Sequence, residues 1–266
     1  MNRTKIEYAD YTWNPVTGCL HNCKYCFARD FVQRFGGTDG TAHLLHVRVK
    51  TLANARGEII GYDIDNPFAY ITKKGKRIKA AFPFKFEPTF HRYRLDEPRF
   101  VKKPLTVFVC DMADLFGKWV PEEWIQEVFT ACDKAQQHRY LFLTKNPARY
   151  IELSNKGKLP ERENFWYGST VVNDNEPIFY SRNHNTFISI EPISGAFDAE
   201  REPPADWVII GAETGKRKNK IIPKFEWVIS LVESCIDSNV PIFLKRNLSK
   251  VWTGELIQQL PWGKNA

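Results

Sequence analysis

The stretch Trp207-Val208-Ile209-Ile210-Gly211-Ala212-Glu213 is an apolar run that ends on a carboxylate. Such a run is typical of a strand buried on both faces, as in a parallel sheet. The same pattern, a β-branched or aromatic run followed by a polar residue, recurs through the second half of the chain. Further strands are predicted at Thr106–Cys110, Tyr140–Leu143, Phe165–Thr170, Phe187–Ile190 and Ile242–Leu244.

Two amphipathic segments between these runs predict helices. The first extends from Pro121 to about Ala135 and begins with a proline and two glutamates, which suit a first turn. The second extends from Lys224 to about Asp237. Each carries an apolar stripe that includes a cysteine, so we expect Cys132 and Cys235 to be core residues. Strands that alternate with helices imply a parallel sheet.

The fold class follows from the number of strands. Two more strands, near Tyr11–Asn14 and Pro88–His91, bring the count to about eight, which predicts an α/β fold: a full or partial TIM-like (β/α) barrel. We expect residues 1–266 to form this single domain. Residues 36–86 read as an inserted, hairpin-rich segment. Between His46 and Phe86 the insertion is basic, with nine Lys or Arg against three acids.

Composition narrows the function classes. The 38 Lys and Arg outnumber the 31 Asp and Glu, which suits either a polyanionic partner or a solvated basic surface. No run of eighteen apolar residues predicts a membrane span, and Met1–Asp10 lacks the apolar core of a signal peptide. Six cysteines in a chain of this length do not predict a disulfide scaffold, so we expect a cytoplasmic protein.

Three of the cysteines lie close together in Gly18-Cys19-Leu20-His21-Asn22-Cys23-Lys24-Tyr25-Cys26, with the spacing C-x3-C-x2-C. Soft thiolates suit zinc or an iron–sulfur cluster. Three thiolates can hold three corners of a [4Fe–4S] cubane and leave the fourth iron without a protein ligand. A closed zinc site needs four ligands, so His21 or Cys110 would have to complete it. Trp13, Tyr25 and Phe27 either give the site apolar cover or pack in the core.

Polar side chains follow the predicted strands, where the chemistry of a barrel is concentrated. Candidate catalytic residues are Glu191, Glu213, Lys145, Lys245 and Asp111. The alternative for the two glutamates is an ion pair with Lys145 or Lys245 that ties the barrel mouth together. Asp114 either shares the site or caps the segment after it. Thr144 and Ser169 are candidate cofactor contacts, because a hydroxyl can meet a ribose hydroxyl.

These motifs resemble the radical S-adenosylmethionine (SAM) superfamily. Its hallmark is this cysteine spacing after the first barrel strand, with an aromatic residue before the last cysteine, here Tyr25. The resemblance implies a [4Fe–4S] cluster on Cys19, Cys23 and Cys26 whose free iron chelates SAM. One electron then cleaves SAM, and the resulting 5′-deoxyadenosyl radical abstracts hydrogen from a substrate. It also implies an electron donor such as flavodoxin or ferredoxin.

Most of the chain is similar to a phage-associated family within that superfamily, the three-cysteine-motif radical SAM proteins. The resemblance rests on Trp13–Cys19, Asp111–Phe116, Leu143–Pro147, Ser189–Pro192 and Trp207–Gly215. The family implies the cofactor but no substrate.

One motif departs from the superfamily pattern. Many members carry Gly-Gly-Glu-Pro after the second strand to hold the SAM amino group, whereas this chain has Lys85-Phe86-Glu87-Pro88. Either Glu87, or Thr89 and His91, takes over that role, or the segment is a strand edge beside Pro88.

Three functions are consistent with these observations. The first is a radical SAM enzyme that acts on a nucleotide or nucleic acid, which the cations and aromatics of the insertion favour. The second is the same chemistry on a peptide or small molecule. The third is a non-catalytic zinc or iron–sulfur nucleic-acid-binding module, which the polar strand ends disfavour. For the first, we expect neutralising Lys73, Lys74, Lys76 and Arg77 to weaken nucleic-acid binding more than neutralising Lys156 and Lys158.

Overall fold

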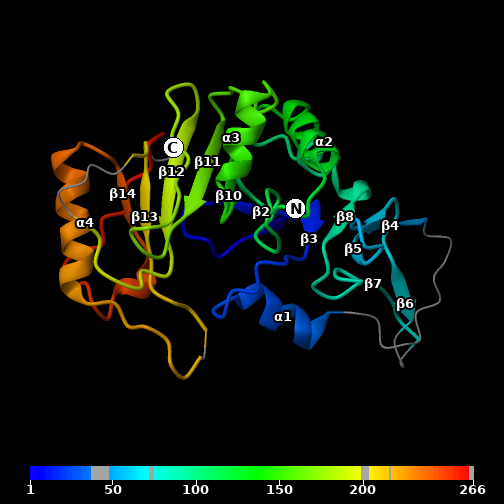
Figure 1. Cartoon of the computed structure of the whole chain (residues 1–266), viewed down its shortest axis with the longest axis horizontal. Coiled ribbons are helices and arrows are strands. Elements are labelled where there is room, and N and C mark those ends of the chain that lie inside the picture. The colour runs from blue at the N-terminus through cyan, green and yellow to red at the C-terminus, as the bar shows by residue number, and fades with distance from the viewer. Residues whose placement is uncertain (37–47, 72–74, 199–203, 216, 264–266) are drawn as a thin grey trace. The chain divides into compact units, whose positions relative to one another are not determined.

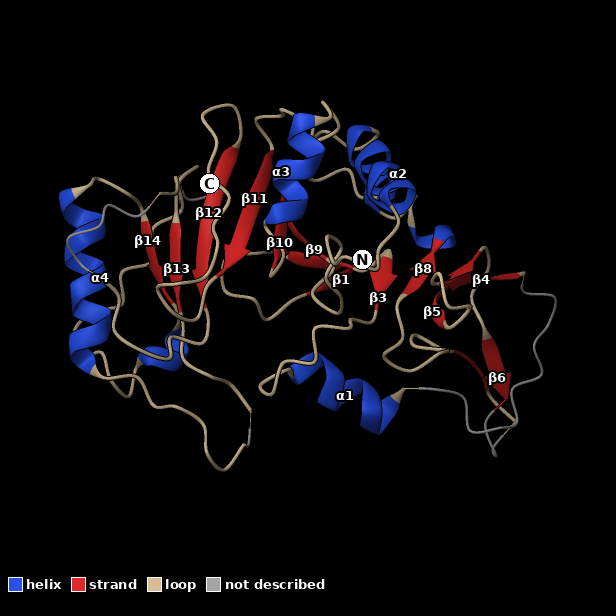
Figure 2. Ribbon diagram, in the orientation of Figure 1, coloured by secondary structure: helices blue, strands red, loops and turns tan. Residues whose placement is uncertain are grey.

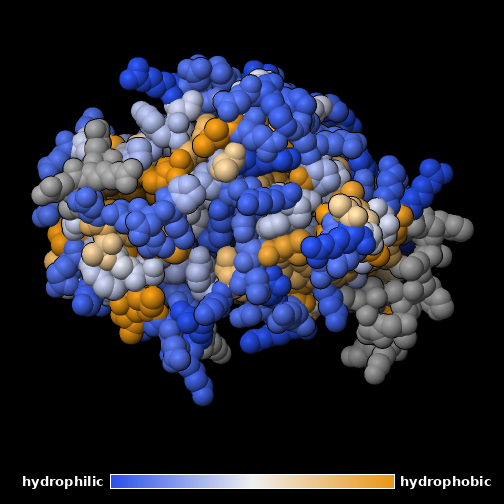
Figure 3. All heavy atoms as spheres, in the orientation of Figure 1, coloured by the Kyte–Doolittle hydropathy of each residue, from blue (hydrophilic) through white to orange (hydrophobic). Residues whose placement is uncertain are grey.

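The computed structural model describes residues 1–36, 48–71, 75–198, 204–215 and 217–263. The chain divides into two compact units. Unit 1 comprises residues 1–5 and 9–139, and unit 2 comprises residues 6–8 and 140–266. Figure 1 labels the elements along the chain, and Figure 2 distinguishes helices from strands. Hydrophilic side chains cover most of the face drawn in Figure 3.

In unit 1, three strands of the first sheet follow one another in the order β1-β2-β9. β1 (Asn2–Arg3) runs antiparallel to β2 (Tyr11–Trp13), and β2 runs parallel to β9 (Thr106–Val109). Helix α2 (Glu122–Asp133) buries an apolar stripe that includes Trp124, Val128 and Cys132. The predicted strands near Tyr11 and Thr106, the predicted helix after Pro121 and the core position of Cys132 are confirmed.

The second sheet of unit 1 has the order β3-β8-β5-β4. Its strands are β3 (Val16–Thr17), β8 (Thr89–His91), β5 (Ile59–Ile64) and β4 (Val49–Ala53). β4 and β5 pair as antiparallel neighbours, and so do β6 (Ala69–Ile71) and β7 (Arg77–Lys79). These antiparallel pairs lie in the segment predicted to be rich in hairpins. Lys73 and Lys74, which the sequence singled out there, fall outside the described residues.

The position of β8 corrects one prediction. We expected Pro88–His91 to be a strand of the parallel barrel, but β8 pairs antiparallel with β3 and parallel with β5 in the second sheet. The chain leaves β2 at Asn14-Pro15 and continues into β3, and β8 pairs with the edge of β3. His91 N–H donates to the Pro15 carbonyl at 2.7 Å, which satisfies backbone groups that the first sheet would have left unpaired.

Unit 1 also has a small apolar core under its hairpins. Ile64, Phe68 and Ala80 are buried together, and Phe84 and Tyr93 pack against them. The rings of Tyr62 and Phe84 stack with centroids 3.7 Å apart. Some aromatic residues of the insertion therefore fill a local core.

Unit 2 contains five parallel strands in the order β10-β11-β12-β13-β14. They are β10 (Arg139–Thr144, whose first residue belongs to unit 1), β11 (Phe165–Thr170), β12 (Asn185–Ile190), β13 (Val208–Ile210) and β14 (Ile242–Leu244). All five lie where the apolar runs predicted strands. The described strands form open sheets within each unit, and the TIM-like barrel stays a prediction.

Two helices belong to unit 2. Helix α4 (Phe225–Asp237) lies along β13 and β14 (Figure 2), and its Val228 and Cys235 join the buried cluster that contains Ile210 and Leu244. The helix predicted after Lys224 and the core position of Cys235 are therefore confirmed. Helix α3 (Ala148–Asn155) packs through Tyr150, whose hydroxyl donates to the Phe142 carbonyl at 3.1 Å.

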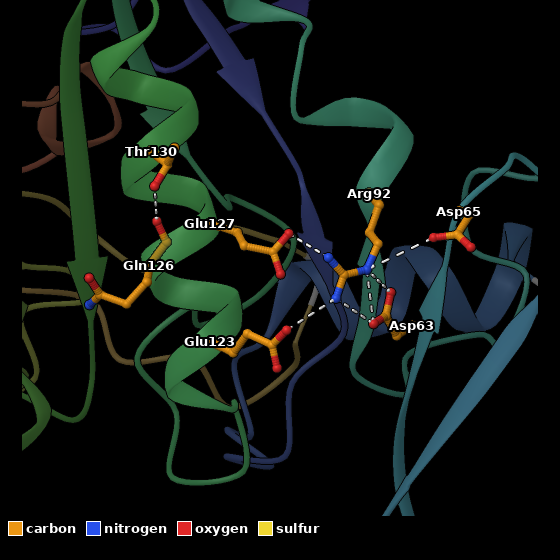
Figure 4. A network of polar contacts seen from close by, with 7 residues as sticks. All are labelled: Asp63, Asp65, Arg92, Glu123, Gln126, Glu127 and Thr130. Carbon is orange, nitrogen blue, oxygen red and sulfur yellow. Dashed lines mark hydrogen bonds and ion pairs between the residues drawn. The ribbon is translucent and has the colours of Figure 1, made fainter.

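Short 3₁₀ turns complete the described elements: η1 (Arg92–Arg94), η2 (Pro98–Phe100) and η3 (Arg246–Leu248). Arg92, at the start of η1, lies among four carboxylates of unit 1 (Figure 4). Its guanidinium donates two 2.8 Å hydrogen bonds to Asp63 on β5 and one hydrogen bond to Glu127 on α2. Glu123 and Asp65 lie farther away, at 3.8 and 3.9 Å. Burial opposes the charged form, but the bonds to Asp63 and Glu127 outweigh it and raise the pKa of Arg92.

We expect Arg92→Met to lower the free energy of unfolding by about 3–5 kcal/mol, because Asp63 is 6% exposed and would lose its ionic partner. Arg99→Met is the matched control. Arg99 pairs with Asp96 at 3.4 Å while both side chains are about half exposed, so its loss should cost less than about 1 kcal/mol. Urea unfolding measures both changes. Equal losses in the two variants would show that the Arg92 cluster adds nothing beyond a surface ion pair.

Candidate metal-binding cysteine loop

The cysteine loop connects β3 to helix α1 (Phe27–Phe35), and its first residues are fixed to two other segments of unit 1. Gly18 N–H donates to the Met112 carbonyl at 2.9 Å, and Cys19 N–H donates to the Phe86 carbonyl at 3.2 Å. Gly18 has φ +83°, in the left-handed region that favours glycine. The loop therefore starts from a defined position rather than from a free turn.

Side chains hold the rest of the loop. Cys26 is the N-cap of α1, and its thiol accepts the Arg29 N–H at 3.4 Å. The Arg29 guanidinium donates to the Cys19 carbonyl at 2.8 Å and stands 5.0 Å over the Phe86 ring. These contacts join both ends of the loop to the first turn of α1.

His21 forms the remaining anchor of the loop. Its Nε2 lies 2.7 Å from Asp114 Oδ2, and its ring meets Trp119 edge-on at 4.8 Å. Asp114 also accepts the Phe116 N–H at 3.0 Å through Oδ1. Both interpretations of Asp114 are therefore partly met, since it caps a turn and also reaches the loop.

The three loop thiols are half-buried and form no disulfide. Burial, and then the charges of Asp114, Cys23 and Cys26, raise the pKa of Cys19 to about 12, against a backbone hydrogen bond at His21 that lowers it. Across the described residues, no three or more His, Cys, Asp or Glu side chains form a ready-made metal site. The chemistry of the donors fits an iron–sulfur cluster, because one loop carries all three thiols and a bound metal favours their thiolate form.

Two N–H groups beside the loop were not predicted. Among the described residues, Arg29 Nε and Trp119 Nε1 are buried without a hydrogen-bond partner. Unpaired buried donors call for an explanation, and sulfur atoms of a cluster are acceptors of such bonds. No motif in the sequence marks either residue. Phe27, expected to cover the site or the core, is instead 62% exposed, whereas Trp13 is fully buried as expected.

The other predicted residues of unit 1 have defined partners. Asn14 donates to Asp111 Oδ1 at 2.6 Å, and burial raises the pKa of Asp111. His91 is fully buried, and its Nε2 lies 2.9 Å from Thr17 Oγ1. Burial lowers the pKa of His91 well below its ordinary value, so the ring is neutral. The Glu87 side chain is exposed, although its backbone lies against Gly18.

Tyr25, the aromatic residue before the last cysteine, is half-buried. Thr89 Oγ1 donates to the Glu87 carbonyl at 2.9 Å. Thr89 and His91 are thus engaged in local contacts, and β8 lies between β3 and β5 rather than at the edge of its sheet.

In unit 2 the parallel strands bring their polar ends together. The Lys245 ammonium donates to Glu191, so the ion-pair alternative is met for this glutamate. Glu213 instead pairs with Arg217 through bonds of 2.7 and 2.6 Å, which lower its pKa. The alternative of a lysine partner is therefore not met for Glu213. Lys145 is half-buried at the end of β10.

The two hydroxyls proposed as cofactor contacts serve local structure. Thr144 Oγ1 accepts the Asn146 N–H at 2.9 Å. Ser169 is fully buried, and its Oγ accepts the Phe179 N–H at 3.0 Å. Thr144 is in register with Ser169, and Ser169 is in register with Ile188, three residues before Glu191. Both hydroxyls therefore lie near the same end of the sheet as Glu191.

Comparison with known proteins gives a family and nothing more specific. Neither the curated proteins nor the solved structures contain a match to this chain. None of the helices in the described ranges has the length and apolar character that crossing a bilayer requires. One family model matches residues 3–255, and the chain therefore belongs to the family described as "Protein of unknown function (DUF5131)".

Proposed function

We propose that this protein is a radical SAM enzyme that holds a [4Fe–4S] cluster on Cys19, Cys23 and Cys26. The observation that carries the proposal is the arrangement of three half-buried thiols, none of them in a disulfide, in one anchored loop between β3 and α1. Three thiolates leave one iron of a cubane open for SAM. When bound, the cluster supplies the electron that converts SAM to the radical used for hydrogen abstraction. Such chemistry suits a reducing cytoplasm.

The contacts of the loop bear on the zinc alternative. A closed zinc site would need His21 or Cys110 as its fourth ligand. His21 is engaged with Asp114 at 2.7 Å, and Cys110 is 3% exposed, with burial raising its pKa. Cys110 is therefore covered where it stands, whereas His21 could still bind zinc through Nδ1, because a carboxylate commonly orients a metal-binding histidine. Metal and sulfide analysis distinguishes the two sites.

The strand-end pairs supply the polar groups for cofactor or substrate. Glu191 with Lys245 and Glu213 with Arg217 each offer a carboxylate beside a cation. A carboxylate there can accept a hydrogen bond from a donor group of a ligand. We keep Asp111 and Lys145 as further candidates within their own units.

The test is SAM cleavage. The anaerobic, dithionite-reduced protein should convert SAM to 5′-deoxyadenosine, and Glu191→Gln should lower that yield at least about tenfold, the effect of a lost interaction worth about 1.4 kcal/mol, with unchanged iron. Glu152→Gln is the control, because the Glu152 side chain is 41% exposed and, among the described residues, pairs with its helix neighbours Arg149 and Lys156. One tightly bound zinc without sulfide, or iron without any SAM cleavage, would overturn the proposal.

A further inference from the structure

Helix α1 carries a row of exposed phenylalanines. Phe27, Phe31 and Phe35 are 62%, 38% and 72% exposed and follow one another at four-residue spacing. Neighbouring ring centroids lie 6.0 and 5.1 Å apart, and Phe82 adds a fourth ring 6.4 Å from Phe31. We call these four residues the phenylalanine row. A surface helix normally turns its apolar side inward, yet α1 buries only Val32. An exposed apolar row of this kind indicates a binding surface.

The charge of the chain is concentrated in the same unit. Unit 1 has 22 Lys and Arg against 15 Asp and Glu, whereas unit 2 has 16 of each, so unit 1 carries the whole formal charge of +7. Exposed cations flank the row along the sequence. They are Lys24, Arg34, Lys79 and Lys85. Cations interleaved with aromatic rings suit a polyanion whose bases can stack.

A cavity of about 720 Å³ adjoins the row. Phe31 and Phe82 of the row line it, and Lys79 contributes a cation. Asn14 and Asp111 add hydrogen-bonding groups to its lining. Its size falls within the range of about 300–1,000 Å³ typical of small-molecule sites, which is enough for one nucleotide turned out of a strand.

The same cavity begins beside the cysteine loop. Met112 lines the cavity, and its carbonyl accepts the Gly18 N–H directly before Cys19. A nucleotide held in the cavity would therefore lie next to the residues proposed to hold the cluster. The row leads along α1 away from that point.

We propose that the phenylalanine row and the adjoining cavity bind single-stranded nucleic acid, with bases stacked on the rings and one nucleotide in the cavity. This inference rests on the proposed function, because it names the substrate class of the same enzyme. An acidic electron-transfer protein is the competing occupant of a basic, apolar face. The cavity favours nucleic acid, since a protein that only delivers electrons needs no polar pocket.

The experiment measures fluorescence anisotropy of a labelled 20-nucleotide oligo(dT) and of the matching RNA, with the cluster-containing protein at low salt. Phe27→Ala, Phe31→Ala and Phe35→Ala combined should weaken binding at least about tenfold, because the three rings on which bases would stack are removed together. Alanine keeps the helix propensity of α1. Phe100→Ala is the control, since Phe100 is 68% exposed in the same unit but outside the row.

Two further variants test the charge and the cavity. Lys24→Gln with Arg34→Gln should weaken binding and flatten its dependence on salt, whereas Lys102→Gln with Lys103→Gln should change neither. Ala81→Trp places bulk in the wall of the cavity, at an exposed position that also lines it, and should lower affinity as well.

Three outcomes overturn the inference: no oligonucleotide binding at low salt, equal losses in the control variants, or a row variant that loses binding of an acidic flavodoxin while it still binds oligonucleotide. Binding is measured without SAM, so it is separate from the test of the proposed function. Oligonucleotide binding by a protein that lacks iron would contradict the enzyme but not the nucleic-acid surface. SAM cleavage without oligonucleotide binding would contradict only this inference.

Discussion

Replacing Cys19, Cys23 or Cys26 singly by alanine should reduce the iron content from about four atoms per chain to nearly none. Each thiolate holds one corner of the proposed cubane, and two remaining thiolates leave two irons without protein ligands. Iron and acid-labile sulfide analysis of anaerobically purified protein measures the effect. This is the largest change we expect from any single substitution.

The position of Cys26 requires a second variant. Its thiol caps α1 by accepting the Arg29 N–H at 3.4 Å, so Cys26→Ala removes both a ligand and a helix cap. Cys26→Ser keeps an N-cap oxygen, which serves a helix start well, but supplies no soft thiolate. Both variants should lose the iron, and only the alanine variant should also loosen the start of α1.

Cys132→Ala and Cys110→Ala are the controls. Cys132 is a fully buried residue of α2, and Cys110 is 3% exposed at the end of β9. Burial raises the pKa of both thiols. Neither should carry a cluster, so both variants should keep their iron. A loop variant that retained four irons, or a Cys110 variant that lost them, would contradict the assignment of the ligands.

The sequence predicted elements well where burial leaves a periodic signal. Runs such as Phe187–Ile190 are buried on both faces of the parallel sheet of unit 2, so composition alone marks them. The stripes of α2 and α4 are equally regular, and their cysteines lie in the core as expected. Local signals of this kind need no knowledge of the tertiary fold.

The sequence failed where a non-local partner decides the outcome. Thr89–His91 is only three residues long, and the free edge of β3 rather than its own pattern determines its sheet. His21 and Asp114 are 93 positions apart, so no spacing rule could bring them together. For Glu213, the alternative to a functional role was an ion pair with a distant lysine, but its partner is Arg217, four residues later.

The sequence also could not predict that the phenylalanines of α1 are exposed. Its phenylalanines recur every four residues, which is the pattern of a buried helix face. The structure leaves Phe27 and Phe35 mostly exposed. Period alone therefore identifies the face of a helix, but not whether that face meets the core or a partner.

Gly18→Ala should also remove most of the iron, although Gly18 contributes no ligand. A β-carbon at Gly18 would lie 2.3 Å from the carbonyl oxygen of Glu87 and 2.7 Å from that of Phe86. These are backbone atoms that no rotamer change can move. The loop would therefore have to move away from Phe86 and Glu87, and the Cys19 N–H would lose its 3.2 Å hydrogen bond to the Phe86 carbonyl.

Gly57→Ala separates this clash from backbone strain. Gly57 has φ +77°, close to the +83° of Gly18, but nothing lies within 4 Å of its added β-carbon. Both substitutions put an alanine in the left-handed region, which costs about 1–2 kcal/mol. Only the β-carbon of Gly18→Ala also clashes with the backbone of Phe86 and Glu87. Hydrogen exchange should then rise around the cysteine loop in Gly18→Ala alone, which gives a readout independent of metal. If both variants lose iron equally, the docking of the loop on Phe86 and Glu87 does not position the cysteines. If Gly57→Ala keeps its iron and Gly18→Ala does not, the segment before Pro88 acts through its backbone, whatever the exposed Glu87 carboxylate does.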